Sequence, residues 1–176
     1  MNKGKPPRLF VAVCLSEEMR DALCRVQRQM RAQQVTGNYI PPENLHLTLA
    51  FIGEFPDPDA VCLPPVNPFP VELDGIGSFG DLWWAGLKFC PPLRRYALAL
   101  RHSLSDGGVP FDRKKFSPHI TLLRRGVGRP EVAVPKAGMV VDHVSLMRSD
   151  RGKHGMIYTE IRRSEPFGPD GTEDRF

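Results

Sequence analysis

The chain has 176 residues, 41% hydrophobic and 25% charged, a composition that excludes a disordered or a fibrous protein. The net charge is +4 at pH 7 and the pI is near 9.0, which modestly favours anionic partners such as nucleotides or RNA. The sequence has no apolar run of membrane-spanning length, and its four cysteines lack disulfide or metal-ligand spacing. We therefore expect a cytoplasmic protein with reduced, mostly buried cysteines and no membrane association, cofactor, metal or need to dimerise.

The first part of the chain predicts a strand followed by an amphipathic helix. The apolar run from Arg8 to Cys14 is too short for a signal peptide and is typical of a buried strand. Ser16 is suited to cap a helix, and apolar residues then recur at helical spacing. These residues are Met19, Ala22, Leu23, Val26 and Met30. The stretch 37–42 should end this helix and lead into the next strand.

The segment ENLHLTLAFIGE, which begins at Glu43, predicts a half-buried strand with an unusual polar face. Successive side chains of a strand point to opposite sides, so the leucines share one face while His46 and Thr48 share the other. Taken alone, such a pair is more often exposed surface than a site. The six prolines of residues 54–70 then argue against any long helix in that stretch.

The second half of the chain repeats this plan. LWWAGLKF, residues 82–89, predicts a strand, and the residues after Pro91 and Pro92 predict an amphipathic helix that ends at Asp106. The segment KKFSPHITLLRR then places His119 and Thr121 on one face of another strand, 73 positions after the first such pair. The matching order of strand, helix and motif therefore indicates an internal duplication.

The same shift of 73 positions equates Phe10 with Trp83 and Val11 with Trp84. We predict an α+β fold of two pseudo-symmetric lobes, with antiparallel sheets lining a central cleft and helices on the outside. Two further strands, Met139 to Met147 and Met156 to Ile161, should be joined by a polar turn. Residues 1–167 are expected to form one two-lobed domain, and residues 168–176 a flexible tail.

Two lobes packed side by side would bring the two polar faces together across one cleft. Histidine titrates near neutrality, so of His46 and His119 one can act as general base and the other as general acid. In-line displacement at phosphorus needs a proton removed on one side and another delivered on the opposite side. The hydroxyls of Thr48 and Thr121, about 6.6 Å along each strand from the histidines, would donate to phosphate oxygens.

Two arginines come after the second motif, and either would add a positive charge suited to a phosphate. Strict alternation favours Arg125, which has the same parity as His119 and Thr121. Arg124 reaches the cleft only if the strand ends or bulges after Leu123. From the residues alone, both alternatives stay open, as does a merely solvated arginine.

The segments NLHLTLAFIGE and SPHITLLRRG resemble the paired H-x-T-x motifs of the two-histidine phosphoesterase superfamily. The start RLFVAVCLSEEMRDAL and the approach PPENLHLTL are similar in particular to its RNA 2′,3′-cyclic phosphodiesterase branch, also described as 2′-5′ RNA ligases. The resemblance extends from about Arg8 to Phe167. It implies metal-independent hydrolysis of the 2′,3′-cyclic phosphate of RNA or a nucleotide to a 2′-phosphate.

The resemblance also implies roles for single residues. His46 would be the proton donor to the leaving 3′ oxygen and His119 the proton acceptor that activates water. Thr48, Thr121 and Arg124 would bind the phosphate, since the motif's arginine falls on Arg124. The alternatives are reversible 2′-5′ RNA ligation by the same residues and a non-catalytic module that binds RNA ends.

Other conspicuous side chains receive weaker functional predictions. Three histidines are expected at the surface: His102, His143 and His154. Lys114 and Lys115 would either contact RNA or be solvated, and Phe116 would either stack on a base or pack in the core. Trp83 and Trp84 alternate in a strand, so one should be core and one should line the cleft.

Overall fold

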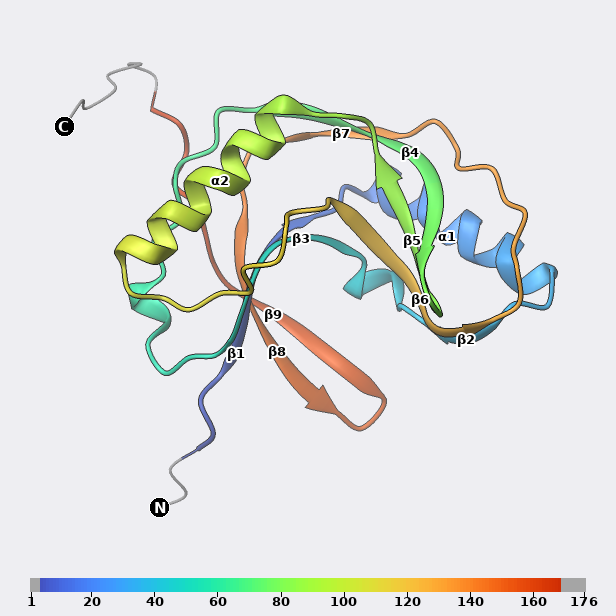
Figure 1. The fold of residues 1–176 in the computed structure, drawn as a ribbon, viewed down its shortest axis with the longest axis horizontal. Helices are drawn as coiled ribbons and strands as arrows, with labels where there is room; N and C mark the ends of the chain where they lie inside the picture. The colour runs from blue at the N-terminus through green and yellow to red at the C-terminus, as the bar shows by residue number, and fades with distance from the viewer. Residues whose placement is uncertain (1–3, 169–176) are drawn as a thin grey trace.

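Two antiparallel sheets and two α-helices form the structure, a computed structural model that describes residues 4–168 (Figure 1). The first sheet has the order β3-β1-β8-β9. Its strands are β1 (Arg8–Cys14), β3 (His46–Glu54), β8 (Ser145–Gly152) and β9 (Gly155–Arg163). The second sheet has the order β2-β6-β5-β4-β7. Its strands are β2 (Thr36–Tyr39), β4 (Phe69–Phe79), β5 (Leu82–Leu87), β6 (His119–Val127) and β7 (Gly138–Val141).

The two sheets repeat one topology, which confirms the predicted α+β fold of two pseudo-symmetric halves. The order β3-β1-β8-β9 corresponds to β6-β5-β4-β7, and β2 is an additional edge strand on β6. Thr48 pairs with Ala12, whereas Thr121 pairs with Trp84. Equating Val11 with Trp84 is therefore wrong by one residue, because the connection that contains the second helix is one residue longer than its counterpart.

Helix α1 (Glu17–Ala32) begins at the predicted cap, where the hydroxyl of Ser16 accepts from the amide of Met19 at 3.2 Å. The predicted apolar residues form its buried face. Although α1 comes after a strand of the first sheet, it packs beside the second (Figure 1). The side-chain amide of Gln27 donates to the carbonyls of Ile40 and Leu122 at 2.9 and 3.0 Å, which ties α1 to β6.

Helix α2 (Pro91–Asp106) makes the reciprocal crossing and lies beside β3 of the first sheet. Its Tyr96 hydroxyl donates to the carbonyl of Pro64 at 2.7 Å, which fixes the proline-rich connection to the helix. That connection holds only the short 3-10 turn η2 (Pro58–Ala60), and it contributes Val61 and Val66 to the core. The absence of a long helix there, predicted from the prolines, is confirmed for this segment.

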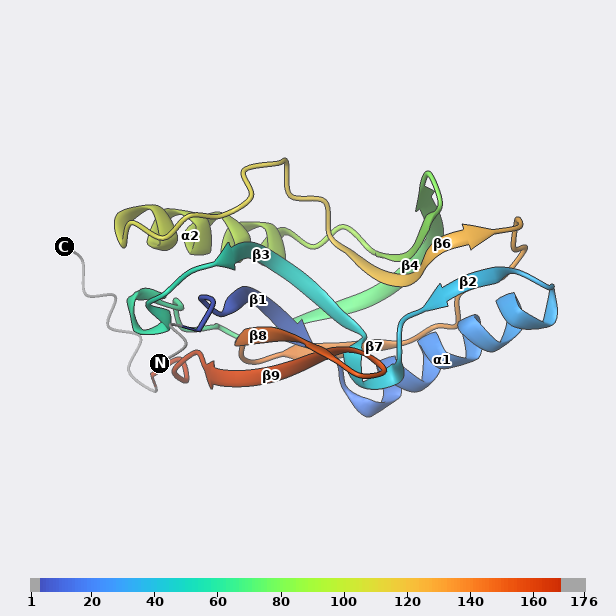
Figure 2. The ribbon, with the colours of Figure 1, turned by 90° about the horizontal axis from the view of Figure 1, so that it is seen from below.

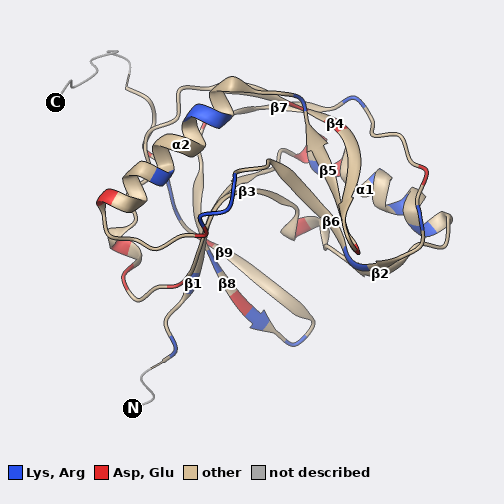
Figure 3. Ribbon diagram, in the orientation of Figure 1, with Lys and Arg blue, Asp and Glu red and all other residues tan. Residues whose placement is uncertain are grey.

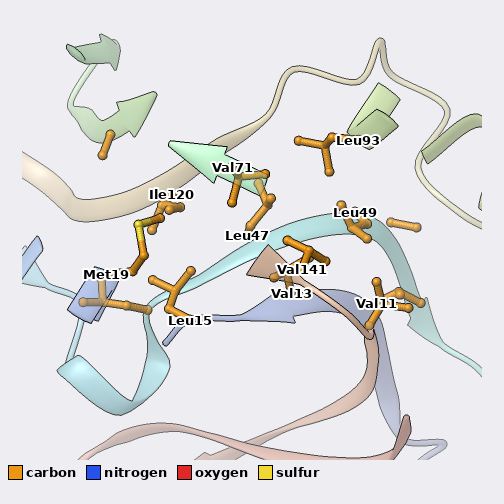
Figure 4. Close-up of a cluster of buried hydrophobic side chains, with 14 of the residues drawn as sticks. Val11, Val13, Leu15, Met19, Leu47, Leu49, Val71, Leu93, Ile120 and Val141 are labelled. Carbon is orange, nitrogen blue, oxygen red and sulfur yellow. The ribbon is translucent and has the colours of Figure 1, made fainter. Parts of the chain in front are cut away.

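The core lies between the two sheets and draws side chains from both halves (Figure 4). Val11 and Leu47 come from the first sheet, Val71 and Ile120 from the second. Strands β3 and β6, one from each sheet, lie near each other (Figure 2). The polar faces of β3 and β6 are thus left uncovered by the core.

Several elements differ from the sequence predictions. The strand expected from Met139 to Met147 is two strands in different sheets, β7 and β8, because the chain crosses between the lobes at residues 142–144. Strands β2 and β4 were not predicted.

Cys14 and Cys62 are exposed, so the expectation of mostly buried cysteines is wrong, and the four are free thiols. In residues 4–168 no helix is long and apolar enough to cross a membrane. Most of the predicted tail, residues 169–176, lies outside the described residues.

Candidate active site

Both motif histidines line one cleft between the two sheets. A hollow of about 290 Å³ contains His46, Thr48 and Arg124, and a second of about 380 Å³ contains Thr48 and His119. Thr48 and Phe51 line both hollows, so the hollows are two ends of one cleft. The structure therefore brings together the histidines that the sequence separates by 73 positions. Thr121 lies on the same face of β6 as His119.

The ring of His46 is held in a defined tautomer. Its Nδ1 lies 2.7 Å from the carbonyl oxygen of Asn44, which can only accept, so Nδ1 carries a proton. In the neutral ring Nε2 is then an acceptor, and the hydroxyl of Thr48 donates to it at 2.9 Å. The side chain of Asn44 donates in turn to the carbonyl of Met156 at 2.8 Å, which fixes this short turn, η1 (Pro42–Asn44), against β9.

His119 repeats half of this arrangement. Its Nδ1 donates to the carbonyl of Ser117, again two residues earlier and again at 2.7 Å. Among the described residues its Nε2 has no hydrogen-bond partner. His119 therefore presents a free nitrogen lone pair to the cleft, whereas His46 shares its own with Thr48.

Aromatic rings surround each histidine. The His46 ring lies 5.0 Å from that of Phe10 and meets Tyr158 edge-on at 5.3 Å. The His119 ring meets Phe79 edge-on at 5.3 Å and lies 6.3 Å from Trp84. These contacts restrict the rotation of both imidazoles.

A β-bulge in each motif strand decides which later side chain faces the cleft. In β6, Leu123 pairs with Trp83 and Thr121 with Trp84, so Leu122 is an extra residue. Leu122 and Leu123 are both buried, and Arg124 returns to the cleft. Arg125 comes next, with a positive φ of 53°. The alternation that favours Arg125 therefore fails, because the extra residue lies inside the strand.

Strand β3 has the same bulge, since Val11 pairs with Ala50 and Ala12 with Thr48. Leu49 and Ala50 are both buried, and Phe51 lines the cleft at the position equivalent to Arg124. The guanidinium of Arg8 lies 5.3 Å from the Phe51 ring centroid. The two halves thus present an arginine and a phenylalanine at one equivalent position.

Burial lowers the pKa of His46 below the ordinary histidine value of 6.5. The hydrogen bond to Asn44 opposes this shift, while the positive charge of Arg124, and that of His119 when it is protonated, lower the pKa further. In residues 4–168 Arg124 has no carboxylate partner. The cleft therefore presents positive charge that an anion would neutralise.

The rim next to His119 carries Lys114 and Lys115, and the partly buried Phe116 packs against the core as well as lining this rim. Trp83 packs against the core, whereas Trp84 pairs with Thr121 and lies 6.3 Å from the His119 ring without lining either hollow. The Trp84 indole lies on Gly77, where a Cβ would come within 2.3 Å of the ring.

His102 and His154 are exposed, and His143 pairs with Asp142 at 2.6 Å, so these three lie outside the cleft as expected.

The sequence interpretation missed the residues that enclose His46. Phe10, Tyr158 and Asn44 come from three separate elements, and their distance from His46 in the chain hides the contacts of the first two. For Phe51 a signal existed, because the 73-residue shift equates it with Arg124. In residues 4–168 no group of three histidine, cysteine or acidic side chains is arranged to hold a metal ion.

Comparison with known proteins links most of the chain to one group of enzymes. A family model described as LigT-like phosphoesterase matches residues 13–82. The chain is 33% identical to an RNA 2′,3′-cyclic phosphodiesterase of Thermus thermophilus, over 94% of this chain and 93% of the relative. It is 30% identical to the RNA 2′,3′-cyclic phosphodiesterase of Escherichia coli, over 91% and 97%.

Solved structures agree with these relatives. The apo crystal structure of Escherichia coli LigT superposes with a TM-score of 0.75 at 27% identity, over 91% of this chain and 97% of LigT. A Thermus thermophilus structure gives 0.71 at 30% identity, over 89% and 96%. LigT has also been crystallised with 3′-AMP, again with a TM-score of 0.75 to this chain, at 27% identity over 90% and 97%.

Proposed function

Because the chain belongs to the RNA 2′,3′-cyclic phosphodiesterase family of LigT-like phosphoesterases, we propose that it hydrolyses 2′,3′-cyclic phosphates of RNA or nucleotides to 2′-phosphates. One observation carries this proposal: two histidines from duplicated strands line one cleft with Arg124. Two imidazoles, two hydroxyls and a guanidinium are the groups that acid-base displacement at phosphorus requires.

In the proposed reaction, the Nε2 of His119 removes a proton from water, and the water oxygen attacks phosphorus. The bond from phosphorus to the 3′ oxygen breaks, and His46 delivers a proton to that oxygen. The product keeps its phosphate on the 2′ oxygen. The free Nε2 of His119 suits a base, and Thr48, Thr121 and Arg124 would stabilise the charge on the non-bridging oxygens.

The lowered pKa of His46 bears on its role as acid. The lowered pKa favours the neutral form of His46, so a bound substrate must help to charge it. The cyclic phosphodiester carries a negative charge that raises the pKa of a neighbouring imidazole. Its oxygens would also accept the Thr48 hydroxyl, which frees Nε2 of His46 for the proton it must deliver.

The test incubates the purified protein, with EDTA present, with a nucleoside 2′,3′-cyclic phosphate and separates the 2′- from the 3′-monophosphate. We expect the 2′-phosphate only, and its loss in His46→Gln and His119→Gln. A 3′-phosphate product would mean that the 2′ oxygen, and not the 3′ oxygen, is the leaving group. Inhibition by EDTA would contradict the metal-independent mechanism.

The same assay separates the remaining alternatives. A module that only binds RNA ends would give no product from the folded wild type, although it would bind the cyclic phosphate. Reversible ligation would appear as 2′-5′ joined product when a second RNA with a free 5′ hydroxyl is supplied in excess. Both reactions use the same cleft residues, so the substrate added decides which one is observed.

A further inference from the structure

A second hollow continues from the end of the cleft that holds His46. Its volume is about 430 Å³, and it shares Arg8, Ser149 and Met156 with the hollow around His46. It lies where the start of β1 meets the hairpin of β8 and β9, which projects from the body of the molecule in Figure 1. We call it the basic hollow.

The lining of the basic hollow carries an excess of positive charge. Four cationic side chains face two carboxylates there: Lys5, Arg8, Arg148 and Arg151 against Glu54 and Asp150. Lys5 pairs with Glu54 at 2.7 Å, and Arg148 pairs with Asp150 at 3.0 Å. Within residues 4–168 this leaves Arg8 and Arg151 without a carboxylate partner. Figure 3 shows the basic positions along this hairpin.

The strand register gives these two arginines the same side of the sheet as the active site. Ser149 pairs with both Arg8 and Tyr158, and Arg151 pairs with Met156 two residues further along β8. Paired residues share a face, and so do residues two apart. Arg8 and Arg151 therefore continue the face on which Tyr158 meets His46.

The proposed reaction determines which way an RNA strand leaves the cleft. In-line displacement puts the leaving 3′ oxygen next to His46 and the attacking water next to His119. The 3′ oxygen belongs to the terminal ribose, and the rest of the RNA is attached to that ribose through its 5′ carbon. The strand must therefore extend from the His46 side, toward the basic hollow and away from Lys114 and Lys115.

We infer that the basic hollow binds the phosphodiester that precedes the terminal nucleotide, with Arg151 and Arg8 as its cations. The substrate class is then an RNA strand with a cyclic phosphate end rather than a free cyclic nucleotide. This inference rests on the proposed function, because the direction of the strand depends on the roles of the two histidines.

Three substrates are compared to measure the contribution of the preceding phosphodiester. They are adenosine 2′,3′-cyclic phosphate, the adenosine dinucleotide with the same cyclic end, and this dinucleotide with an uncharged methylphosphonate link. We expect the wild type to show kcat/KM about tenfold higher for the charged dinucleotide than for the methylphosphonate, the value of one charge-assisted hydrogen bond. Arg151→Gln should strongly reduce this preference, with Arg8 left as the remaining cation, and leave turnover of the mononucleotide unchanged. Lys153→Gln, which removes an exposed charge at the tip of the same hairpin, should preserve the preference.

Salt gives a second measure. On logarithmic axes, the kcat/KM of the charged dinucleotide should fall more steeply with salt concentration than that of the mononucleotide, by a slope of about 0.7 for one phosphate contact, and Arg151→Gln should reduce this difference. Equal rates for the two dinucleotides in the wild type would overturn the inference. So would loss of the preference in Lys114→Gln or Lys115→Gln, which would direct the strand to the His119 side.

Failure of the proposed function has a different signature, which is a folded wild type that turns over none of the three substrates. In that case fluorescence anisotropy with the labelled dinucleotide and its methylphosphonate analogue tests the basic hollow directly. Tighter binding of the charged form that depends on Arg151 would support the site, and equal binding would refute it.

Discussion

The two halves of the molecule build the same local device and place it in different surroundings. Each histidine donates from Nδ1 to the carbonyl two residues earlier at 2.7 Å, and each strand bulges after its threonine. His46, however, is half-buried beside Tyr158 and bonded to Thr48, whereas the Nε2 of His119 is free of protein partners among the described residues. Duplication therefore supplies the symmetry of the cleft, and the neighbours of each ring make the two histidines unequal.

The position after each bulge shows the same divergence. Arg124 in one half and Phe51 in the other occupy equivalent places, so this position carries a positive charge in one half only. That charge contributes to the lowered pKa of His46. Arg124 and Phe51 thus show that a difference at one position of a repeated strand can give the two copies of a motif different chemistry.

The largest effect should come from removing either histidine. His46→Gln and His119→Gln are each expected to lower kcat by about 10²- to 10⁴-fold, the usual contribution of one general acid or base. The double variant should be little slower than the slower single variant, because the two groups act in one step. Steady-state kinetics on a cyclic phosphate measures this. If one variant kept most of its activity, only the other histidine would take part in the chemistry.

Arg124→Gln tests the asymmetry of charge. We expect kcat/KM to fall about 10- to 100-fold, because one charge-assisted contact to the phosphate is lost. The pKa of His46 should rise, since the Arg124 charge lowers it in the wild type. Histidine ring signals monitored by NMR during a pH titration report this shift.

Arg125→Gln is the matched control for that experiment. Arg125 is exposed and does not line the hollow around His46, so both the rate and the pKa of His46 should stay close to wild type. An equal effect of both substitutions would mean that overall charge, and not the bulge, sets the properties of the cleft.

Asn44 and Ser117, whose carbonyls hold the rings of His46 and His119, should differ in how much their side chains contribute to stability. Asn44→Ala removes the donor to the carbonyl of Met156 and should lower the free energy of unfolding by about 1 to 3 kcal/mol. In the other half Ser117→Ala keeps the carbonyl that holds His119, so its effect should be within about 0.5 kcal/mol. Urea denaturation compares them, and equal losses would show that the turn before β3 is not specially braced.

The smallest effect concerns pH. Since the pKa of His46 is lower in the folded than in the unfolded chain, only the unfolded chain binds this proton between the two values. Stability contributed by neutral His46 should therefore be present above pH 6.5 and be lost as pH falls through the folded pKa. The difference in unfolding free energy between wild type and His46→Gln, measured across this range, should show that slope. A flat difference would contradict the lowered pKa.

Local patterns were sufficient for the motifs and the helices. Alternation within a strand is set by the backbone, so the common faces of His46 with Thr48 and of His119 with Thr121 could be predicted from the sequence. The apolar periodicity and the Ser16 cap likewise predicted α1 with its buried face. The duplicated order of these elements then led to the two-lobed α+β fold.

Tertiary structure alone decided which arginine enters the cleft and what surrounds each histidine. Arg124 faces inward because β6 inserts Leu122 where it pairs with β5, and strand pairing is not encoded in alternation. Phe10 and Tyr158 reach His46 only because β1, β8 and β9 assemble beside β3. The sequence by itself determined the reactive groups and their faces, since both depend on local geometry. Their charges, neighbours and access to the basic hollow depend on contacts between distant segments, which only folding establishes.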